Sequence, residues 1–500
     1  MRTLLLNPSC KTTLNAWLER YYIRSGSRWP HSGVKLKNSR PHYLPFPFSL
    51  AYGAAVLKQD GFDVQVIDAV ALDMGEAALL DEIVRLKPRL VFYECSTPTF
   101  ARDMQLAGRI KHLTNAKVAI AGMHADAFCM EILAGQRSVD FVLHGEYEWP
   151  LLGLARALRD GRDDFPPGMA YRRQSLVVET GSLRSPVPLD DLPFPLREYF
   201  PCLSRPQPQV YWDGFCQFRP ALQMQTSRGC RWQCYFCLPA HNSRQSGGFR
   251  VFSAGRVIAE MRELINRYGA REIYFDDDNF TADKGHVFDV CQEMLKSGVR
   301  VPWSCTGDII GLDKNTLQLM SRSGCVGIKF GIESGSPRIM QSVGKPVDLK
   351  KAAEVIGECR KLAIKTQAAF TIGLLGETAE DLQKTFYCAR SLKADALQVS
   401  IATPFPGTEF YRLAKNSGVL RDAGWEAYDG KTSALIRSGG TENLAKTKRR
   451  FLLRWFFGRM VSFPWAFRHG AVLVRTVRGV GVTFFLRQVF AVIIDEWKNR

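Results

Sequence analysis

The chain has 500 residues, of which 46% are apolar and 23% charged, a composition typical of globular proteins. This composition excludes intrinsic disorder and collagen-like repeats, and the length predicts about two to four domains. The net charge of +18 lies mostly at the ends, since residues 1–48 carry +7, residues 441–500 carry +9 and the middle only +2. We expect no nucleic-acid substrate such as transfer RNA, because the nearly neutral middle lacks an excess of phosphate-binding side chains.

Targeting and membrane segments are not expected. The apolar run Leu4–Leu6 ends at an Asn-Pro pair, before the roughly 7 to 15 apolar residues that a signal peptide needs. The long apolar stretch near the C-terminus falls short of the ~18 uncharged residues of a membrane helix, because it contains Arg475, Arg478 and Arg487. We therefore expect a cytoplasmic protein, in which clustered cysteines indicate metal binding or catalysis before disulfides.

Residues 1–155 alternate short apolar runs with helical patterns. Strands are predicted over Leu4–Leu6, Val64–Ile67, Leu90–Tyr93, Val118–Ala121 and Phe141–Leu143, and helices over Ser49–Gln59 and Arg102–Leu113. Continuous apolar strands separated by helices are typical of a parallel sheet covered on both faces. The pattern predicts a doubly wound, Rossmann-like α/β domain that binds ligands beyond the carboxyl ends of its strands.

Residues 156–214 are rich in proline around one predicted hairpin, Ser175–Ser182. We expect a linker that packs on its neighbours without building a core.

Residues 215–430 resume the alternation with longer helices. Helices are predicted over Val257–Tyr268 and from a capping box at Thr378–Asp381. Six strands are predicted over Leu222–Thr226, Glu272–Phe275, Val301–Cys305, Val326–Phe330, Thr366–Ile372 and Ala396–Ile401. Six βα units favour a partial (βα)6 barrel, with its chemistry on the loops that follow the strands.

Three cysteines, Cys230, Cys234 and Cys237, directly follow the first barrel strand. A zinc site completed by His241 is one interpretation, but structural zinc normally uses two paired sets of ligands, and no second pair is present. Three thiolates on a short loop can instead hold three corners of a [4Fe-4S] cluster. The fourth iron then stays open for the amine and carboxylate of S-adenosylmethionine (SAM). We expect the other ten cysteines to be small core residues.

This Cys-x3-Cys-x2-Cys spacing after the first strand of a six-unit barrel resembles the radical SAM superfamily. The resemblance implies that the SAM amino group lies at the end of the second strand, by Asp277, Asp278 and Asn279. It also implies that Glu333, with Ser334 beside it in Gly331–Ser336, binds the ribose, and that Gly373 belongs to an adenine-supporting segment. Phe236 would lie against the adenine, and Thr403–Thr408 matches the loop after the sixth strand in a large subgroup.

The first domain resembles the cobalamin-binding (B12-binding) domain that precedes the barrel in one branch of this superfamily. The resemblance implies a cobalamin site made by Asp68, Ser96, Thr97, Gly122, His124, Gly145 and Glu146, with His144 a further candidate. One departure from the older pattern Asp-x-His-x-x-Gly is clear, because no histidine has an aspartate two positions before it. This absence is usual in the radical SAM branch and would leave the lower cobalt face without a protein histidine.

The family resemblance implies a metal-binding, iron–sulfur enzyme that uses a [4Fe-4S] cluster, SAM, cobalamin and an external one-electron reductant. The reaction we favour is methylation of an unactivated carbon in a small or lipid-like molecule, through a 5′-deoxyadenosyl radical and methylcobalamin. No catalytic residue beyond the cluster ligands is expected. The alternatives are an oxidative cyclase or rearranging enzyme without net methyl transfer, and a non-catalytic iron–sulfur protein.

Residues 431–500 form a basic and aromatic C-terminal region that we expect to be helical. Its composition suits peripheral contact with an anionic membrane surface, which would also suit a lipid-like substrate. The other interpretation is a helical cap that packs on the barrel and leaves its arginines in solvent.

Overall fold

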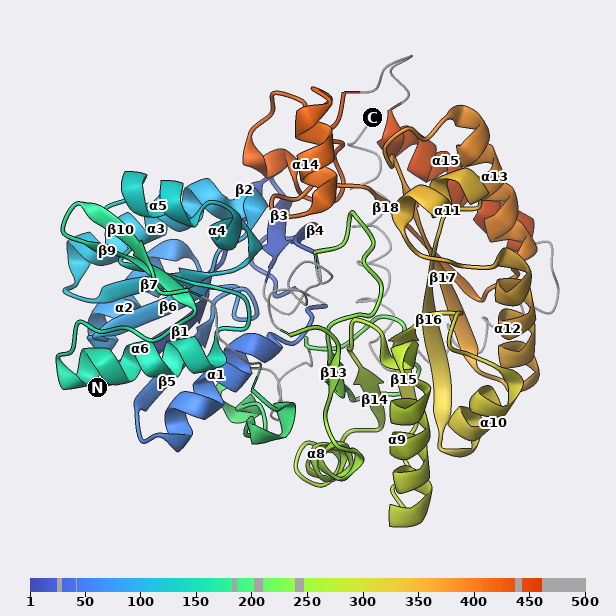
Figure 1. Cartoon of the computed structure of the whole chain (residues 1–500), viewed down its shortest axis with the longest axis horizontal. Coiled ribbons are helices and arrows are strands. Elements are labelled where there is room, and N and C mark those ends of the chain that lie inside the picture. Colours follow the sequence, from blue (N-terminus) through green and yellow to red (C-terminus); the bar gives the residue numbers. More distant parts are fainter. Residues whose placement is uncertain are drawn as a thin grey trace.

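The computed structural model describes residues 1–460 except 25–28, 42, 182–186, 202–209, 239–246 and 437–442. Two α/β parts lie side by side, the N-terminal one in blue and cyan and the barrel in green to orange (Figure 1). The predicted fold class is confirmed: a doubly wound domain precedes a six-stranded parallel sheet.

The first domain is built on a seven-stranded sheet in the order β10-β9-β8-β7-β6-β1-β5. Its parallel strands are β1 (Arg2–Asn7), β5 (Asp63–Asp68), β6 (Leu90–Glu94), β7 (Lys117–Ala121) and β8 (Phe141–Leu143). All five contain the predicted strand segments. The chain winds in one direction from β1 to β5 and in the other from β6 through β7 to β8, so the ligand crevice is expected between β1 and β6.

Helices cover both faces of this sheet. One core joins Leu5 of β1 to α1 (Phe48–Gln59) and α6 (Glu148–Asp160). The opposite core joins Leu4 and Leu6 to α2 (Glu76–Leu86), α3 (Phe100–Leu113) and α5 (Cys129–Gly135); the short α4 (Met123–Ala127) precedes α5. Successive strand residues point to opposite faces, so an apolar run such as Leu4–Leu6 is buried on both sides.

The segment expected to be a linker instead extends the first sheet. A hairpin of β9 (Met169–Arg173) and β10 (Leu176–Glu179) pairs antiparallel with β8. The hairpin predicted over Ser175–Ser182 is thus misplaced, and its position is corrected to Met169–Glu179. Buried side chains show that the segment does build core: Met169, Ala170, Leu189 and Leu192. The prolines mark its turns, while these apolar residues decide its packing. The expected boundary at residue 155 falls inside α6.

A three-stranded antiparallel sheet lies between β1 and α1 and was not predicted. It consists of β2 (Lys11–Thr13), β3 (Leu18–Ile23) and β4 (His31–Leu36). Short 3-10 turns are found at η1 (Thr97–Thr99), η2 (Leu189–Asp191), η3 (Arg197–Tyr199), η4 (Phe280–Ala282) and η5 (Trp425–Ala427).

The second part is a partial barrel of six parallel strands that follow one another in chain order. They are β11 (Ala221–Met224), β14 (Glu272–Phe275), β15 (Trp303–Gly307), β16 (Cys325–Glu333), β17 (Lys365–Ile372) and β18 (Ala396–Ile401). The helices are α8 (Ala254–Asn266), α9 (Lys284–Ser297), α10 (Lys314–Arg322), α11 (Pro337–Val343), α12 (Leu349–Lys361), α13 (Ala379–Ser391) and α14 (Glu409–Asn416). A small ribbon, β12 (Ser227–Arg228) with β13 (Arg250–Val251), follows β11. The six predicted strands are confirmed, as is the capping box of Thr378 and Asp381.

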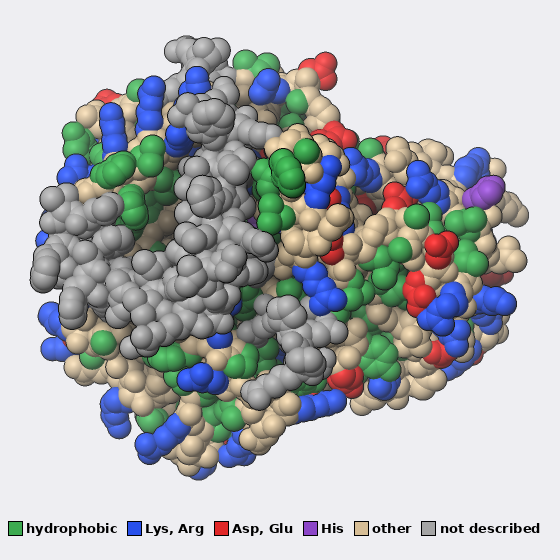
Figure 2. Space-filling view, turned by 180° about the vertical axis from the view of Figure 1, so that it is seen from behind, with side chains coloured by type: hydrophobic (Ala, Val, Ile, Leu, Met, Phe, Trp, Pro, Cys, Tyr) green, Lys and Arg blue, Asp and Glu red, His purple; other side chains and the backbone are tan. Residues whose placement is uncertain are grey.

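The C-terminal region contributes α15 (Leu444–Met460), which packs against β18 and α13 (Figure 1). Leu444, Phe451 and Trp455 are buried, so this part forms a helical cap on the barrel. Among the residues that the structure describes, no helix is long and apolar enough to cross a membrane. Lysines and arginines are spread over the back face and do not form one stripe among the side chains drawn there (Figure 2).

Candidate functional site

The three cysteines lie on one loop that begins after β12. All three are free thiols, and the Cys237 amide donates to the Cys234 carbonyl at 3.0 Å, which makes the loop a tight turn. The loop is fixed to the barrel through Tyr235, whose amide donates to the Val343 carbonyl and whose carbonyl accepts from the Phe410 amide. His241, the fourth ligand of the zinc alternative, lies outside the described residues.

A buried lysine faces this loop. The ammonium of Lys345 donates to the Gly331 carbonyl at 2.8 Å and lies 3.3 Å from a Glu333 carboxylate oxygen. Burial raises the pKa of the Cys234 thiol to about 12, while the charge of Lys345 opposes this shift. A metal that binds here would displace the thiol proton, because the thiolate is the ligand form. The three-thiol loop with a neighbouring cation fits the ligand set of an iron–sulfur cluster with one open corner.

The three polar residues after β14 differ in burial and in the groups that they contact. Asp277 is fully buried, and its carboxylate accepts from the amides of Thr226 and Ser227 at 2.6 and 3.0 Å. Burial raises the Asp277 pKa to about 6. The Asp278 carboxylate accepts from the Gly229 amide at 3.2 Å, and the Asn279 amide nitrogen lies 3.9 Å from Cys230 Sγ. Asp277 thus fixes the turn leading into the cysteine loop, while its neighbours lie beside the loop.

The predicted SAM-binding residues that follow β16 and β17 also make contacts with different parts of the molecule. Glu333 has a left-handed backbone, with φ of 68°, at a register shift, and its carboxylate accepts from the Thr371 hydroxyl at 2.9 Å. The hydroxyl of Ser334 is buried against Thr385 of α13 at 3.0 Å. Gly373 has a φ of 87°, and an added Cβ would lie 2.6 Å from the Leu444 side chain. Glu333 therefore faces the cysteine loop through Lys345, whereas Ser334 and Gly373 contact helices. Phe236 is buried beside Cys234.

A cavity of about 230 Å³, partly open to solvent, lies between the two parts of the molecule. Its walls contain six of the seven residues predicted to bind cobalamin: Ser96, Thr97, Gly122, His124, Gly145 and Glu146. The opposite wall includes Arg228, Gly229 and Asp278 of the barrel. The carboxyl ends of β6, β7 and β8 thus open onto the same space as the cysteine loop.

Asp68, the seventh predicted residue, does not line this cavity. It is 1% exposed and its carboxylate accepts from Asn7, from the Val70 and Ala71 amides and from the Tyr211 hydroxyl. Burial raises its pKa, and these hydrogen bonds oppose the shift. Asp68 stabilises the turn after β5, which lies at the other side of the point where the strand order reverses.

Gly122 and His124 form one wall of the cavity. Gly122 has a φ of 110°, and an added Cβ would lie 2.5 Å from the Cys95 carbonyl oxygen, so the position requires glycine. The His124 ring packs 4.5 Å from Phe100, 5.0 Å from Phe128 and 5.0 Å from Trp425, measured between ring centroids. Burial lowers the His124 pKa to about 4, which keeps the imidazole neutral.

Buried ion pairs join the two walls. Arg228, two residues before the first cysteine, donates to Glu146 at 3.0 Å and to Glu148 at 2.6 Å, and Arg250 also pairs with Glu146. Sequence reasoning missed Arg228 and Glu148. The sequence shows an arginine two positions before Cys230 and two glutamates after β8. No pattern in the sequence indicates that these side chains form ion pairs with one another. It also missed Lys345 and Trp425, which lie far from every motif.

Comparison with known proteins gives two family matches, the radical SAM superfamily over residues 224–387 and a B12 binding domain over residues 39–155. An uncharacterized methyltransferase of Pyrococcus horikoshii is 28% identical, covering 87% of this chain and 93% of its own. The anaerobic magnesium-protoporphyrin IX monomethyl ester cyclase of Cereibacter sphaeroides is 24% identical, covering 91% and 75%. The radical SAM methyltransferase TsrM of Kitasatospora setae, solved with cobalamin and a [4Fe-4S] cluster, has the same fold, with a TM-score of 0.64 and 17% identity over 90% of this chain and 85% of its own.

Proposed function

Because the chain belongs to the cobalamin-binding radical SAM enzymes, in which a B12-binding domain precedes a radical SAM domain, we propose that it is a methyltransferase. The acceptor we propose is an unactivated carbon of a small or lipid-like molecule. The observation that carries the proposal is the cavity that the carboxyl ends of β6 to β8 share with the mouth of the barrel. The methyltransferase relative from Pyrococcus horikoshii supports the reaction class.

The cysteine loop is the proposed cluster site. Cys230, Cys234 and Cys237 would hold a [4Fe-4S] cluster and leave one iron open for SAM. Bound together, the cluster, SAM and cobalamin supply the one-electron and methyl-transfer chemistry, and an external one-electron reductant is required. The chain supplies positioning and exclusion of water, which the partly buried cysteine loop and its anchors at Val343 and Phe410 support.

The SAM-binding residues follow from their places around the loop. Asp278 and Asn279 would accept the SAM amino group, Glu333 the ribose hydroxyls, and Phe236 would lie against the adenine. The buried contacts of Asp277 and Ser334 favour positioning roles for these two residues. Gly373 would hold the adenine-supporting turn against α15.

The cobalamin-binding residues would act from the opposite wall. Ser96 and Thr97 offer hydroxyls, Gly122 and Gly145 allow close backbone approach, and Glu146 is held in place by two arginines. His124 would present a neutral ring edge. Asp68 would not contact the cobalamin and would instead stabilise the turn after β5.

The proposal is tested by anaerobic reconstitution with cobalamin, a reductant and a panel of candidate acceptors, including tetrapyrroles and hopanoid lipids. Methyl transfer predicts S-adenosylhomocysteine and 5′-deoxyadenosine in equal yield together with a methylated product. An acceptor converted with 5′-deoxyadenosine alone would contradict methyl transfer and favour the cyclase, the function of the relative from Cereibacter sphaeroides.

The cluster assignment has its own test. Cys234→Ala is expected to lose the charge-transfer absorbance of the cluster and both SAM products. The matched control is Cys388→Ala, because Cys388 is a partly buried cysteine on α13, away from the loop. A Cys234→Ala protein that kept the absorbance would contradict the assignment.

Membrane contact through the C-terminal region stays a prediction. Phe456 and Phe457 of α15 are exposed, but most of the region lies outside the described residues. Sedimentation of the full chain with anionic and with neutral vesicles would test it, and equal recovery with both would contradict an electrostatic contact.

A further inference from the structure

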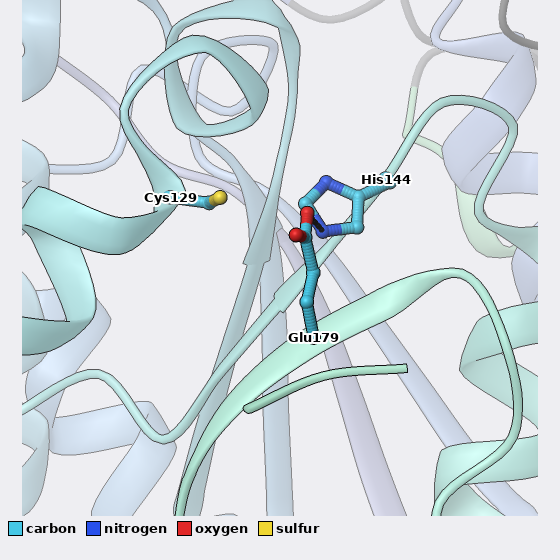
Figure 3. A group of neighbouring side chains, drawn as sticks. All are labelled: Cys129, His144 and Glu179. Carbon is cyan, nitrogen blue, oxygen red and sulfur yellow. Dashed lines mark ion pairs between the residues drawn. The ribbon is translucent and has the colours of Figure 1, made fainter. Parts of the chain in front are cut away.

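A second group of potential metal ligands lies in the first domain, away from the cysteine loop. Cys129 begins α5, His144 follows β8, and Glu179 ends β10 (Figure 3). One ligand atom from each of the three lies within 4.8 Å of the other two. Three side chains from separate elements thus converge on one point.

The imidazole of His144 is oriented for a ligand. Its Nδ1 lies 3.0 Å from an Asp126 carboxylate oxygen, and the other oxygen of Asp126 accepts from the Gly145 amide at 3.1 Å. A proton on Nδ1 leaves the lone pair on Nε2, which is buried and has no hydrogen-bond partner. A carboxylate behind the distal ring nitrogen is the arrangement that commonly orients a metal-bound histidine.

We propose that Cys129 Sγ, His144 Nε2 and a Glu179 carboxylate oxygen bind a zinc ion, with a fourth position open to water. A thiolate, an imidazole and a carboxylate form a donor set that suits zinc and not magnesium or calcium, which prefer oxygen ligands alone. The thiolate and the carboxylate together balance the two charges of the ion.

The geometry needs only a small local adjustment. Nε2 of His144 lies 3.6 Å from the Glu179 carboxylate, and this side chain is 56% exposed, so it can rotate toward the ion. Cys129 and Asp126 are buried and set the fixed side of the site. Burial also raises the pKa of the Cys129 thiol, so zinc would displace its proton, as at other thiolate sites.

A zinc ion here would fasten the hairpin edge of the first sheet. Glu179 ends the outermost strand, while Cys129 and His144 belong to α5 and to the loop after β8. The same Asp126 that orients His144 also holds Gly145, a residue of the cavity wall.

The test uses the full chain with its cluster reconstituted, incubated with zinc and then passed through a desalting column with a weak chelator. We expect about one zinc per chain by mass spectrometry. X-ray absorption at the zinc edge, to which iron is silent, is expected to show one sulfur ligand and the remainder nitrogen or oxygen. A shell of three sulfur ligands would place the zinc on the cysteine loop and overturn the proposal. Absence of retained zinc would also overturn it, because His144 would then bind no metal.

Variants separate the ligands from their surroundings. Cys129→Ser and Glu179→Gln are each expected to weaken zinc binding by about tenfold or more in competition with a chromophoric chelator. Cys388→Ser is the matched control and is expected to bind zinc like the parent protein. Glu179 is exposed, so Glu179→Gln tests the site even if Cys129→Ser fails to fold. Unchanged affinity in Glu179→Gln, with zinc still bound by one sulfur, would contradict the assignment of this ligand set.

Discussion

Gly122 is a residue of the cavity wall that leaves no room for a side chain. Gly122→Ala would combine a left-handed backbone with a Cβ 2.5 Å from the Cys95 carbonyl oxygen. We expect a loss of about 2–4 kcal/mol in the stability of the first domain. The midpoint of thermal unfolding in the cofactor-free chain measures this loss.

The matched control is Gly108→Ala in the middle of α3, where an added Cβ meets nothing within 4 Å. Alanine favours helix by about 0.5–1 kcal/mol over glycine, so this midpoint is expected to rise slightly. Two glycine-to-alanine changes in one domain therefore have opposite predicted signs. If both variants unfolded like the parent, the close approach at Gly122 would be disproved.

His124 predicts a pH dependence of stability. Its pKa is about 4 in the folded protein against 6.5 for an ordinary histidine, so between these values the unfolded chain binds more protons. The stabilisation is complete above pH 6.5 and is lost as the pH falls toward 4. For this residue alone, we expect a loss of about 2 kcal/mol between pH 7 and pH 5.

Substitution isolates this contribution from those of other groups. His124→Gln is expected to show a smaller decrease of the unfolding midpoint between pH 7 and pH 5 than the parent protein. His112→Gln changes an exposed histidine on α3 and is expected to leave the decrease unaltered. Identical pH profiles for His124→Gln and the parent would show that His124 is not the titrating group.

Single residues show where sequence patterns stop being informative. The family resemblance implies that Asp277, Asp278 and Asn279, at the end of the second barrel strand, form one group of acceptors for the SAM amino group. The structure places the Asp277 carboxylate on the turn before the cysteine loop and Asp278 at the cavity. Consecutive residues near a strand end point in different directions, and which one faces the ligand depends on the register with β11.

At the scale of elements, the strands rich in apolar residues could be predicted from the sequence. The strands of the small antiparallel sheet could not. β14 and β18 begin and end at the predicted residues. β14 is buried throughout, as expected for a parallel strand that is covered on both faces, whereas β18 is only partly buried and keeps Val399 and Ile401 in the core. β2 (Lys11–Thr13) and β4 (His31–Leu36) contain lysine, threonine and serine in place of such a run. Their pairing is decided by β3 and by contacts with residues near 429, which are distant in sequence.

α15 provides the prediction at this scale. Phe451 is buried against Phe370 of β17 and Phe386 of α13, whereas Phe457 on the same helix is 60% exposed. Phe451→Ala is expected to lower barrel stability by about 3–5 kcal/mol, and Phe457→Ala by less than about 0.5 kcal/mol. Equal effects in thermal unfolding would mean that α15 does not cap the barrel.

At the scale of the whole molecule, Arg228 ties the barrel to the first domain. Glu148 is 1% exposed, so Arg228→Met would leave its carboxylate buried without this partner. We expect a loss of about 3–5 kcal/mol in stability and faster proteolysis between the two domains.

A double variant tests the pairing itself. Arg228→Met with Glu148→Gln is expected to recover part of the loss, since the unpaired charge is removed. Arg412→Ala breaks an exposed pair with Glu409 and is expected to leave the unfolding midpoint nearly unchanged. A double variant as unstable as the sum of its single variants would contradict a direct interaction.

The segment Trp425–Asp429 has a consequence for the order in which the protein is completed. Trp425 packs on His124 and Phe128, and the Asp429 carboxylate accepts from the Ser32 hydroxyl at 3.1 Å. Both contacts belong to the first domain, yet the residues that complete them leave the ribosome only after the whole barrel has been translated. During synthesis, this side of the first domain therefore stays without its covering segment until residues 425–429 have been added.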